Sequence, residues 1–164
     1  MLVVIIGQSG SGKTTIEKEL IFKGFEPIVI YHDRPPRKDD PYWYETTALS
    51  SIRRMSYTQT GVNGNTYGYQ SRLKLHNYYV VSFTEMSKAR AYVKSLIKCP
   101  KVKYFYMEPN PNAKAVLVNR GTPAKEIIYR LSQSNKNRIG SACCITFEKA
   151  YATIMNKVFG RGRW

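Results

Sequence analysis

The sequence opens with MLVVIIGQSGSGKTTIEKEL (residues 1–20), and this stretch decides the fold. The apolar, β-branched run LVVII (2–6) is typical of a buried strand. The segment GQSGSGKT (7–14) matches the spacing G-x-x-x-x-G-K-S/T without a gap, and a helical pattern follows it. A strand, a glycine-rich loop and a helix in this order predict a phosphate-binding loop in an α/β protein.

Each residue type in this loop has a physical role. Glycines let the backbone curl so that its N–H groups point at phosphate oxygens, and the following helix adds its positive N-terminus. Lys13 can reach the β- and γ-phosphates of a nucleotide, and the Thr14 hydroxyl can hold Mg²⁺. We therefore expect ATP, or a similar triphosphate, together with Mg²⁺. The predicted ATP-binding residues are Gly7, Ser9, Gly10, Ser11, Gly12, Lys13, Thr14 and Thr15.

Several classes of P-loop protein fit the rest of the chain poorly. The sequence contains no N-K-x-D stretch of the kind that GTPases use to read guanine. With 164 residues, the chain is too small for most motor or AAA-type ATPases. Phosphoryl transfer to a small acceptor is the class of reaction that remains.

The chain is strongly basic. It carries 26 Lys and Arg residues against 11 Asp and Glu residues, a formal net charge of +15. Such a field attracts phosphates of any size, so a nucleic acid is a second candidate partner. The basic residues are nevertheless scattered, and only the tail RGRW (161–164) is dense. A nucleotide enzyme with a basic site is therefore the preferred interpretation.

Composition also bears on the compartment. No apolar run is long enough for a membrane span, and the N-terminus lacks a signal-peptide pattern. Cys99, Cys143 and Cys144 fit neither a disulfide framework nor a paired metal motif. We expect reduced core cysteines in a cytoplasmic protein.

The order of elements predicts an α/β fold with a P-loop NTPase-type parallel sheet of about five strands flanked by helices. We expect one domain over residues 1–164, with a small inserted lobe at 33–70 and a lid at 112–135. The expected strands are 2–6, 25–31, 77–83, 101–108 and 142–147. The expected helices are 14–24, 84–96, 148–160 and two pieces within 110–137 that break at 121–123. The lobe has the composition of loops, short antiparallel strands and one short helix near 46–55.

A pair of arginines follows the second expected strand, in YHDRPPRKDD (31–40). Two prolines between Arg34 and Arg37 stiffen the backbone, and two rigid guanidiniums at the carboxyl end of a strand would form a fork for a phosphate. An exposed basic loop is the alternative. Asp33 would orient Arg34, contact Mg²⁺ through water, or lie in solvent.

These motifs, in this order, resemble the guanylate kinase family of nucleoside monophosphate kinases. The family has T-T-R-x-P-R-x-G-E after its second strand, and HDRPPRKDD (32–40) contains the R-x-P-R core. Family stretches D-Y-x-F and N-Y-Y-G-S/T correspond to PYWY (41–44) and GNTYGY (64–69). The resemblance implies that 33–70 binds the monophosphate and that Arg34, Arg37, Tyr42 and Tyr67 hold its phosphate. Packing in the core is the alternative for each tyrosine.

The resemblance continues into the second half of the chain. LVNRGTPAKEIIYRL (117–131) is similar to the family's lid segment, whose arginines close on the transferring phosphoryl group. Arg120 and Arg130 match those arginines, the second with a spacing one residue shorter. Arginines from a closing lid neutralise charge and exclude water, although a helix-surface position is the alternative. The implied catalytic residues are Lys13, Arg34, Arg37, Arg120 and Arg130.

The sequence departs from the family where guanine is read. The family uses two carboxylates and a small hydroxyl residue, but the matching positions here are Thr58 (beside Gln59), Ser82 or Thr84, and Tyr69. These residues become the candidate acceptor-base contacts. Glu85, one residue beyond Thr84, could compensate if the strand end is shifted.

We interpret the chain as an ATP-dependent nucleoside monophosphate kinase whose base specificity is open between GMP, a pyrimidine, a deoxynucleotide and a modified nucleotide. The alternatives are a P-loop kinase acting on nucleic acid or a modified base, and a non-catalytic guanylate-kinase-like binding module. An intact phosphate loop and paired arginines argue against the last. His32 and His76 have no partner pattern for metal or nucleophile chemistry. We expect a monomer or a homodimer.

Overall fold

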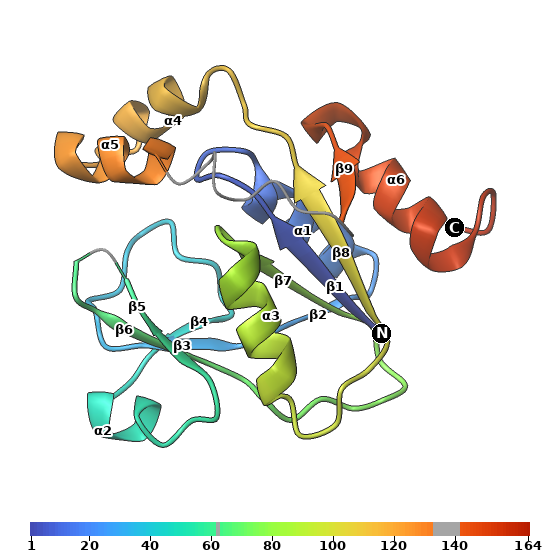
Figure 1. The fold of residues 1–164 in the computed structure, drawn as a ribbon, viewed down its shortest axis with the longest axis horizontal. Helices are drawn as coiled ribbons and strands as arrows, with labels where there is room; N and C mark the ends of the chain where they lie inside the picture. The colour runs from blue at the N-terminus through green and yellow to red at the C-terminus, as the bar shows by residue number, and fades with distance from the viewer. Residues whose placement is uncertain (62, 133–141) are drawn as a thin grey trace.

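A five-stranded parallel sheet forms the centre of the computed structural model, which describes residues 1–61, 63–132 and 142–164 (Figure 1). Its strand order is β2-β7-β1-β8-β9, and every pairing is parallel. The strands are β1 (Leu2–Ile6), β2 (Glu26–Pro27), β7 (Tyr79–Phe83), β8 (Val102–Met107) and β9 (Cys143–Ile145). The predicted α/β fold with about five parallel strands is confirmed.

Helices cover both faces of this sheet. Helix α3 (Met86–Ser95) lies on one face, while α1 (Lys13–Phe22) and α6 (Phe147–Phe159) lie on the other (Figure 1). Side chains of β1 alternate accordingly: Leu2, Val4 and Ile6 pack in the core with α3, and Val3 and Ile5 pack with α1 and α6. A strand buried on both faces needs apolar residues at every position, which explains the unbroken run LVVII.

A second sheet of four short strands adjoins the first. It contains β3 (Ile30–His32), β4 (Tyr44–Thr46), β5 (Thr58–Thr60) and β6 (Thr66–Tyr69) in the order β4-β3-β6-β5. The β3–β4 pair is parallel, and the other two pairs are antiparallel. Helix α2 (Leu49–Ile52) packs against one face, which we call the outer face.

The opposite, inner face of the second sheet is turned toward the parallel sheet. Its register places Ile30 opposite Tyr69 and His32 opposite Tyr67, so these side chains share that face. The Tyr69 ring stacks on Phe83 of β7, with centroids 5.1 Å apart and an angle of 16° between the planes. One aromatic core therefore joins the two sheets.

The prediction of one strand over residues 25–31 is wrong. Strand β2 ends at Pro27, Ile28 donates a last hydrogen bond to Val80, and the chain then enters the second sheet as β3. At the crossing, the Val29 N–H donates to Gln70 Oε1 at 3.2 Å and its carbonyl accepts from the Gln70 N–H at 3.0 Å. Backbone partners from another segment thus let an apparently continuous apolar run divide between two sheets.

Helices α4 (Ala113–Asn119) and α5 (Ala124–Ser132) lie above the carboxyl ends of the central strands, beside the phosphate loop (Figure 1). They separate at 121–123 as predicted, where Gly121 has a φ of +71° and Pro123 precedes α5. The last residues of the expected lid, 133–135, lie outside the described residues.

The cysteines are not the core residues that the sequence suggested. All three are free thiols; Cys99 and Cys144 are exposed and Cys143 is half-buried. β9 is an edge strand of three residues, so only one of its two faces is fully covered. Within the described residues, no helix combines the length and the apolar character that crossing a bilayer requires.

The contact between the second sheet and α2 depends on Gly68. A β-carbon at this position would lie 2.3 Å from Met55 Sδ and 3.0 Å from Ile52 Cγ2. We expect Gly68→Val to displace α2 and to cost about 1–3 kcal/mol of folding free energy. Thermal and urea unfolding would measure the loss, with Thr58→Val on the paired strand as the control. Equal stability of the two variants would contradict this packing.

Candidate active site

The phosphate loop connects β1 to α1, and its backbone conformation requires glycine. Gly10 and Gly12 have φ values of +82° and +92°, in the left-handed region that other residues avoid. A β-carbon on Gly12 would also lie 2.5 Å from the ring of Phe147, the first residue of α6. Both conformation and contact therefore fix this loop as the sequence motif predicts.

The polar groups of the loop suit an anion. Lys13 Nζ lies across the loop and donates to the carbonyl oxygens of Gly7 at 2.7 Å and Gln8 at 2.8 Å. Ser11 Oγ is buried without a hydrogen-bond partner among the described residues. Thr14 is exposed in the first turn of α1, where a hydroxyl can reach a metal ion. The unsatisfied Ser11 hydroxyl, the Lys13 ammonium and the exposed Thr14 hydroxyl are groups that fit a Mg²⁺-bound polyphosphate.

The two predicted lid arginines lie near Lys13. Arg130 NH1 donates to Ser9 Oγ at 3.3 Å, which ties α5 to the phosphate loop. Burial lowers the pKa of Lys13 to about 8; Glu17 opposes this shift, and the positive charges of Arg130 and Arg120 add to it. Lys13 of α1, Arg120 directly after α4 and Arg130 of α5 thus lie close enough for their charges to interact beside the loop. Such clustering is unfavourable unless an anion is bound between them.

Sequence reasoning missed the acid that positions Arg130. Glu126, buried in the first turn of α5, accepts from Arg130 Nε at 2.8 Å and also pairs with its NH2 group. The spacing of four residues, with the acid first, is the usual signal for such a helical pair. Glu126 therefore holds the guanidinium toward the loop.

A second missed acid, Glu17, lies one turn after Lys13 on α1. It is only 4% exposed and accepts hydrogen bonds from the side chain and the backbone of Ser82 on β7. Burial raises the pKa of Glu17 to about 7, while the bonds from Ser82 and the charge of Lys13 oppose the rise. Its signal in the sequence is a charged residue between Ile16 and Leu20, on the helix face that meets the sheet.

Arg34 is buried at the end of β3, where it is held by its own loop. It donates from Nε to the Tyr67 hydroxyl at 3.1 Å and from NH1 to the Pro35 carbonyl at 3.0 Å. Asp40 accepts from NH1 at 2.8 Å and from NH2 at 2.5 Å, in a bidentate pair. These bonds use four of the five guanidinium N–H groups and raise the pKa of Arg34.

Arg37 and Asp33 differ in environment from Arg34. The Arg37 side chain is exposed, and its backbone N–H donates to Asp40 at 2.7 Å. Asp33 Oδ1 accepts from the backbone N–H of Thr66 at 2.8 Å, which joins the loop to β6. Arg34 and Arg37 therefore do not form a matched fork: one guanidinium is enclosed in its loop and the other lies in solvent.

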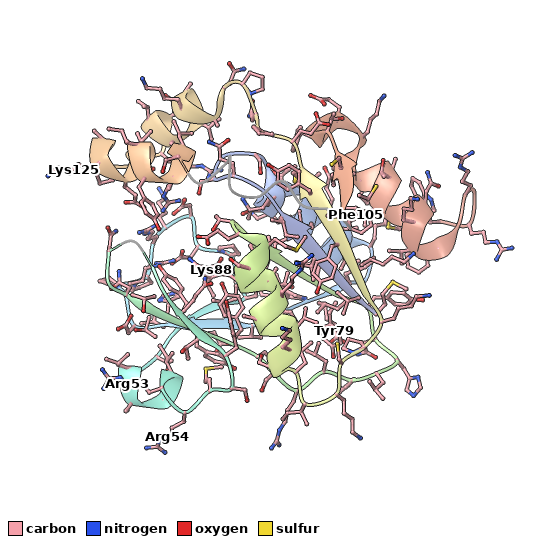
Figure 2. The ribbon with its side chains drawn as sticks, viewed as in Figure 1. Arg53, Arg54, Tyr79, Lys88, Phe105 and Lys125 are labelled. Carbon is pink, nitrogen blue, oxygen red and sulfur yellow. The ribbon has the colours of Figure 1, made fainter. Side chains whose placement is uncertain are left out.

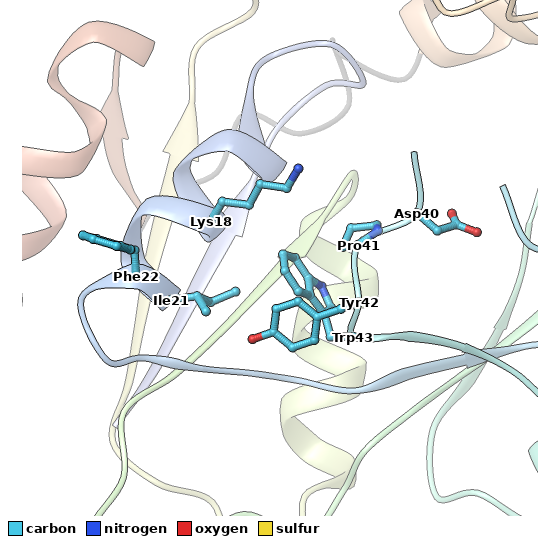
Figure 3. A pocket seen from close by; sticks show the side chains of 7 residues that line it. All are labelled: Lys18, Ile21, Phe22, Asp40, Pro41, Tyr42 and Trp43. Carbon is cyan, nitrogen blue, oxygen red and sulfur yellow. The ribbon is translucent and has the colours of Figure 1, made fainter. Parts of the chain in front are cut away.

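The two predicted phosphate-contacting tyrosines lie in different places. Tyr67 is on the inner face with Arg34, whereas Tyr42 is 73% exposed and faces α1 (Figure 3). Tyr44, two residues on, lies on the inner face beside His32, with ring centroids 6.1 Å apart. Tyr42 precedes β4, which begins at Tyr44, so Tyr44 rather than Tyr42 joins Tyr67 on the inner face.

Tyr42 lines a separate hollow of about 430 Å³ between α1 and the loop before β4 (Figure 3). The hollow is mostly apolar on its α1 side, and Trp43 packs edge-on against Tyr42 with ring centroids 5.1 Å apart. Its lining residues are Lys18, Ile21, Phe22, Asp40, Pro41, Tyr42 and Trp43.

The residues at the family's guanine-reading positions are also distributed by strand register. Thr58 is exposed and paired with Gly68 on the outer face, away from the parallel sheet. Gln59 is on the inner face, where its Nε2 donates to the Tyr69 hydroxyl at 2.7 Å and its Oε1 accepts from Tyr57 at 3.3 Å. Tyr69 itself is buried in the aromatic core. Gln59 and not Thr58 therefore faces the parallel sheet.

The remaining candidates lie at and beyond the end of β7. Ser82 faces α1 and donates to Glu17, and Thr84 follows the strand. Glu85 forms an ion pair at 3.1 Å with Lys88 of α3. Figure 2 shows the position of Lys88. His32 is buried with Nδ1 3.1 Å from the Arg34 carbonyl. His76 is exposed in the turn before β7, on the side of the sheet away from the phosphate loop.

No protein-family model matches the chain, and its sequence matches no curated protein. Comparison with solved structures finds guanylate kinase from Anaplasma phagocytophilum at a TM-score of 0.58 and 14% identity, covering 96% of this chain and 83% of that chain. It also finds a gluconokinase from Sinorhizobium meliloti 1021 at a TM-score of 0.44 and 16% identity, covering 94% and 87%.

The parallel sheet and its phosphate loop define an α/β protein of the P-loop class. Within that class, the chain has a guanylate-kinase-like fold over nearly its whole length. The resemblance inferred from the sequence motifs is thereby confirmed at the level of the fold.

The Arg34–Asp40 pair gives a test of the loop's energetics. Burial raises the pKa of Asp40, but hydrogen bonds from Arg34 and the Arg37 N–H outweigh it and lower the pKa below the usual 3.8. Ionised Asp40 therefore adds stability above about pH 4, and the contribution is lost as the pH falls through the folded-state pKa. We expect Asp40→Asn to cost about 3 kcal/mol at neutral pH, because it leaves Arg34 buried without a counter-charge.

The adjacent, exposed Asp39 provides the control. Asp39→Asn should change the free energy of unfolding by less than about 0.5 kcal/mol. Urea denaturation of the wild type and both variants at neutral and acidic pH would measure the difference. A cost of Asp40→Asn that persists undiminished at acidic pH would contradict the ion-pair explanation.

Proposed function

We propose that this protein is an ATP-dependent nucleoside monophosphate kinase. It would transfer the γ-phosphoryl group of ATP to the phosphate of a ribo- or deoxyribonucleoside monophosphate. The observation that carries the proposal is the cluster of Lys13, Arg120 and Arg130 beside the phosphate loop. The second sheet adjoins the parallel sheet that carries this loop. The fold shared with guanylate kinase supports it.

The proposed reaction is a single displacement. An oxygen of the acceptor phosphate forms a bond to the γ-phosphorus, and the bond from that phosphorus to the β–γ bridging oxygen breaks, which gives ADP and a nucleoside diphosphate. The acceptor oxygen is already anionic, so the reaction needs no strong base. The protein's task is to position the two phosphates and neutralise their charge.

Each side chain of the site has a proposed part in that task. The loop N–H groups and Lys13 hold the donor phosphates, and Arg120 and Arg130 neutralise the group in transfer. Bound Mg²⁺ would neutralise charge on the β- and γ-phosphates, with Thr14 as the protein ligand. Among the described residues, no group of three His, Cys, Asp or Glu side chains offers another metal site. Arg34, Tyr67 and Tyr44 line the inner face on which we place the acceptor.

A kinase that acts on nucleic acid ends is the second candidate, favoured by the net charge of +15. Arg53 and Arg54, directly after helix α2 on the outer face of the second sheet, add exposed positive charge (Figure 2). A panel of acceptors separates the two: ADP formation is measured with ribo- and deoxyribonucleoside monophosphates and with oligonucleotides. Turnover with oligonucleotides alone would refute the monophosphate proposal, and no acceptor-dependent turnover would refute both.

Lys13 is central to the proposed catalysis. We expect Lys13→Ala to lower kcat by at least about 10²-fold, because it removes a preorganised charge from the transition state. Coupled detection of ADP would measure the rate. Lys23→Ala, an exposed position at the end of the same helix, is the control and should keep its activity. Full turnover by Lys13→Ala would place the activity elsewhere.

The lid prediction is tested on α5. We expect Arg130→Gln to lower kcat by about 10-fold or more with a smaller change in the KM for ATP, because its charge acts mainly on the group in transfer. Lys125→Gln removes a positive charge from the exposed face of the same helix, as Figure 2 shows, and is the matched control. Equal effects of the two substitutions would mean that Arg130 acts only through general charge.

A further inference from the structure

Glu17 has a place in the molecule that the proposed function has not used. It lies on α1, between the phosphate loop and the inner face of the second sheet. Its carboxylate is bonded to Ser82 of β7, and it is close enough to Tyr44 of β4 and Tyr69 of β6 to act on them electrostatically. We call these four residues, together with Lys13, the junction: Lys13, Glu17, Tyr44, Tyr69 and Ser82.

The backbone explains why an acceptor group is needed at Ser82. Tyr78 and Val80 direct their carbonyls to the β2 side of β7, and Phe83 directs its carbonyl to Gly7 on the β1 side. By alternation, the Ser82 N–H points to the β2 side, but the chain there has already left for the second sheet after Ile28. A half-buried N–H without a strand partner finds one elsewhere, and Glu17 supplies it.

This backbone requirement does not by itself call for a carboxylate. A neutral glutamine or threonine could accept from Ser82 without the cost of burying a charge. A carboxylate has about four lone-pair directions, and Ser82 supplies only two donors, one from its backbone and one from its hydroxyl. Acceptor capacity therefore remains at the junction, facing residues that the resemblance places around the acceptor base.

We infer that Glu17 is a specificity-determining residue of the acceptor site, where its carboxylate accepts a hydrogen bond from an N–H or O–H group of the acceptor nucleoside. This inference rests on the proposed function and deepens it. It supplies, from α1, the carboxylate that is absent at Ser82, Thr84 and Thr58. Glu85 does not fill that role, since it pairs with Lys88 on α3.

Access to Glu17 requires a movement that the chain path permits. Glu17 is 4% exposed, so an acceptor reaches it when the second sheet shifts away from α1. The second sheet joins the parallel sheet through two adjacent segments, at Val29 and Gln70, whose backbones are bonded to each other. Two crossings side by side form a hinge, and lobe movements of this kind admit substrate in many kinases.

The test compares wild type, Glu17→Gln and the control Glu19→Gln, an exposed acid on the same helix. Initial rates are measured at saturating ATP and Mg²⁺ with ribo- and deoxyribonucleoside monophosphates of each base. We expect Glu17→Gln to lower kcat/KM for the preferred acceptor by about 10- to 100-fold, the effect of one hydrogen bond to a charged group. The KM for ATP should change by less than about 3-fold, and the ranking of acceptors should change.

The comparison of acceptors also identifies the group that donates the hydrogen bond to Glu17. A loss that depends on the base assigns an N–H donor, and a loss confined to ribonucleotides assigns a sugar hydroxyl. An equal loss with every acceptor, or an equal rise in the KM for ATP, would show that Glu17 acts only on structure or through Lys13, and the inference would be overturned. If the wild type phosphorylates no monophosphate, the proposed function fails and this inference with it.

Glu17→Asp guards against misfolding of the glutamine variant. It keeps the charge but withdraws the carboxylate by one methylene group, so it should show a weaker loss with the same preference among acceptors. Thermal unfolding establishes that each variant is folded before rates are compared. If neither variant folds, Glu17 serves structure alone and the inference is rejected.

Discussion

The structure depends on how one central strand satisfies its backbone where its neighbour ends. Strand β7 is paired on one side with β1 over five residues but on the other with β2 over only two. The polypeptide that would have continued β2 instead builds the second sheet. The unpaired end of β7 therefore brings together three things at one point: a second sheet, a buried acid on α1, and the first turn after the phosphate loop.

Charge is arranged around that point in a consistent way. Cations from three helices surround the phosphate loop, and two buried acids are set behind them, Glu126 behind Arg130 and Glu17 behind Lys13. Glu126 holds Arg130 by an ion pair, and the charge of Glu17 acts on Lys13 electrostatically. Positive charge is thus concentrated where phosphates would lie and balanced where protein packs against protein, although the chain as a whole is far from neutral.

How much the sequence could predict differs between the two halves of the site. The phosphate loop follows from contiguous residues, because its spacing, its glycines and the strand before it are local properties. The separation of α4 from α5 at 121–123 was equally local. The second sheet could not be predicted from local sequence in this way. Tyr42 and Tyr44 are the same residue type in the same short segment, and only the pairing of β3 with β4 shows that Tyr44 faces inward. Thr58 and Gln59 exchange roles for the same reason, and Arg34 meets Asp40 only because the loop folds back on itself.

The packing of Phe147 against Gly12 links two segments that are far apart in the sequence. The phosphate loop owes its conformation to contiguous residues, yet the ring that lies against it belongs to the first residue of α6. Helix α6 packs beside α1 on the same face of the parallel sheet. The docking of α6 therefore forms one side of the nucleotide site, and a substitution that loosens α6 would disturb phosphate binding without touching the loop motif itself.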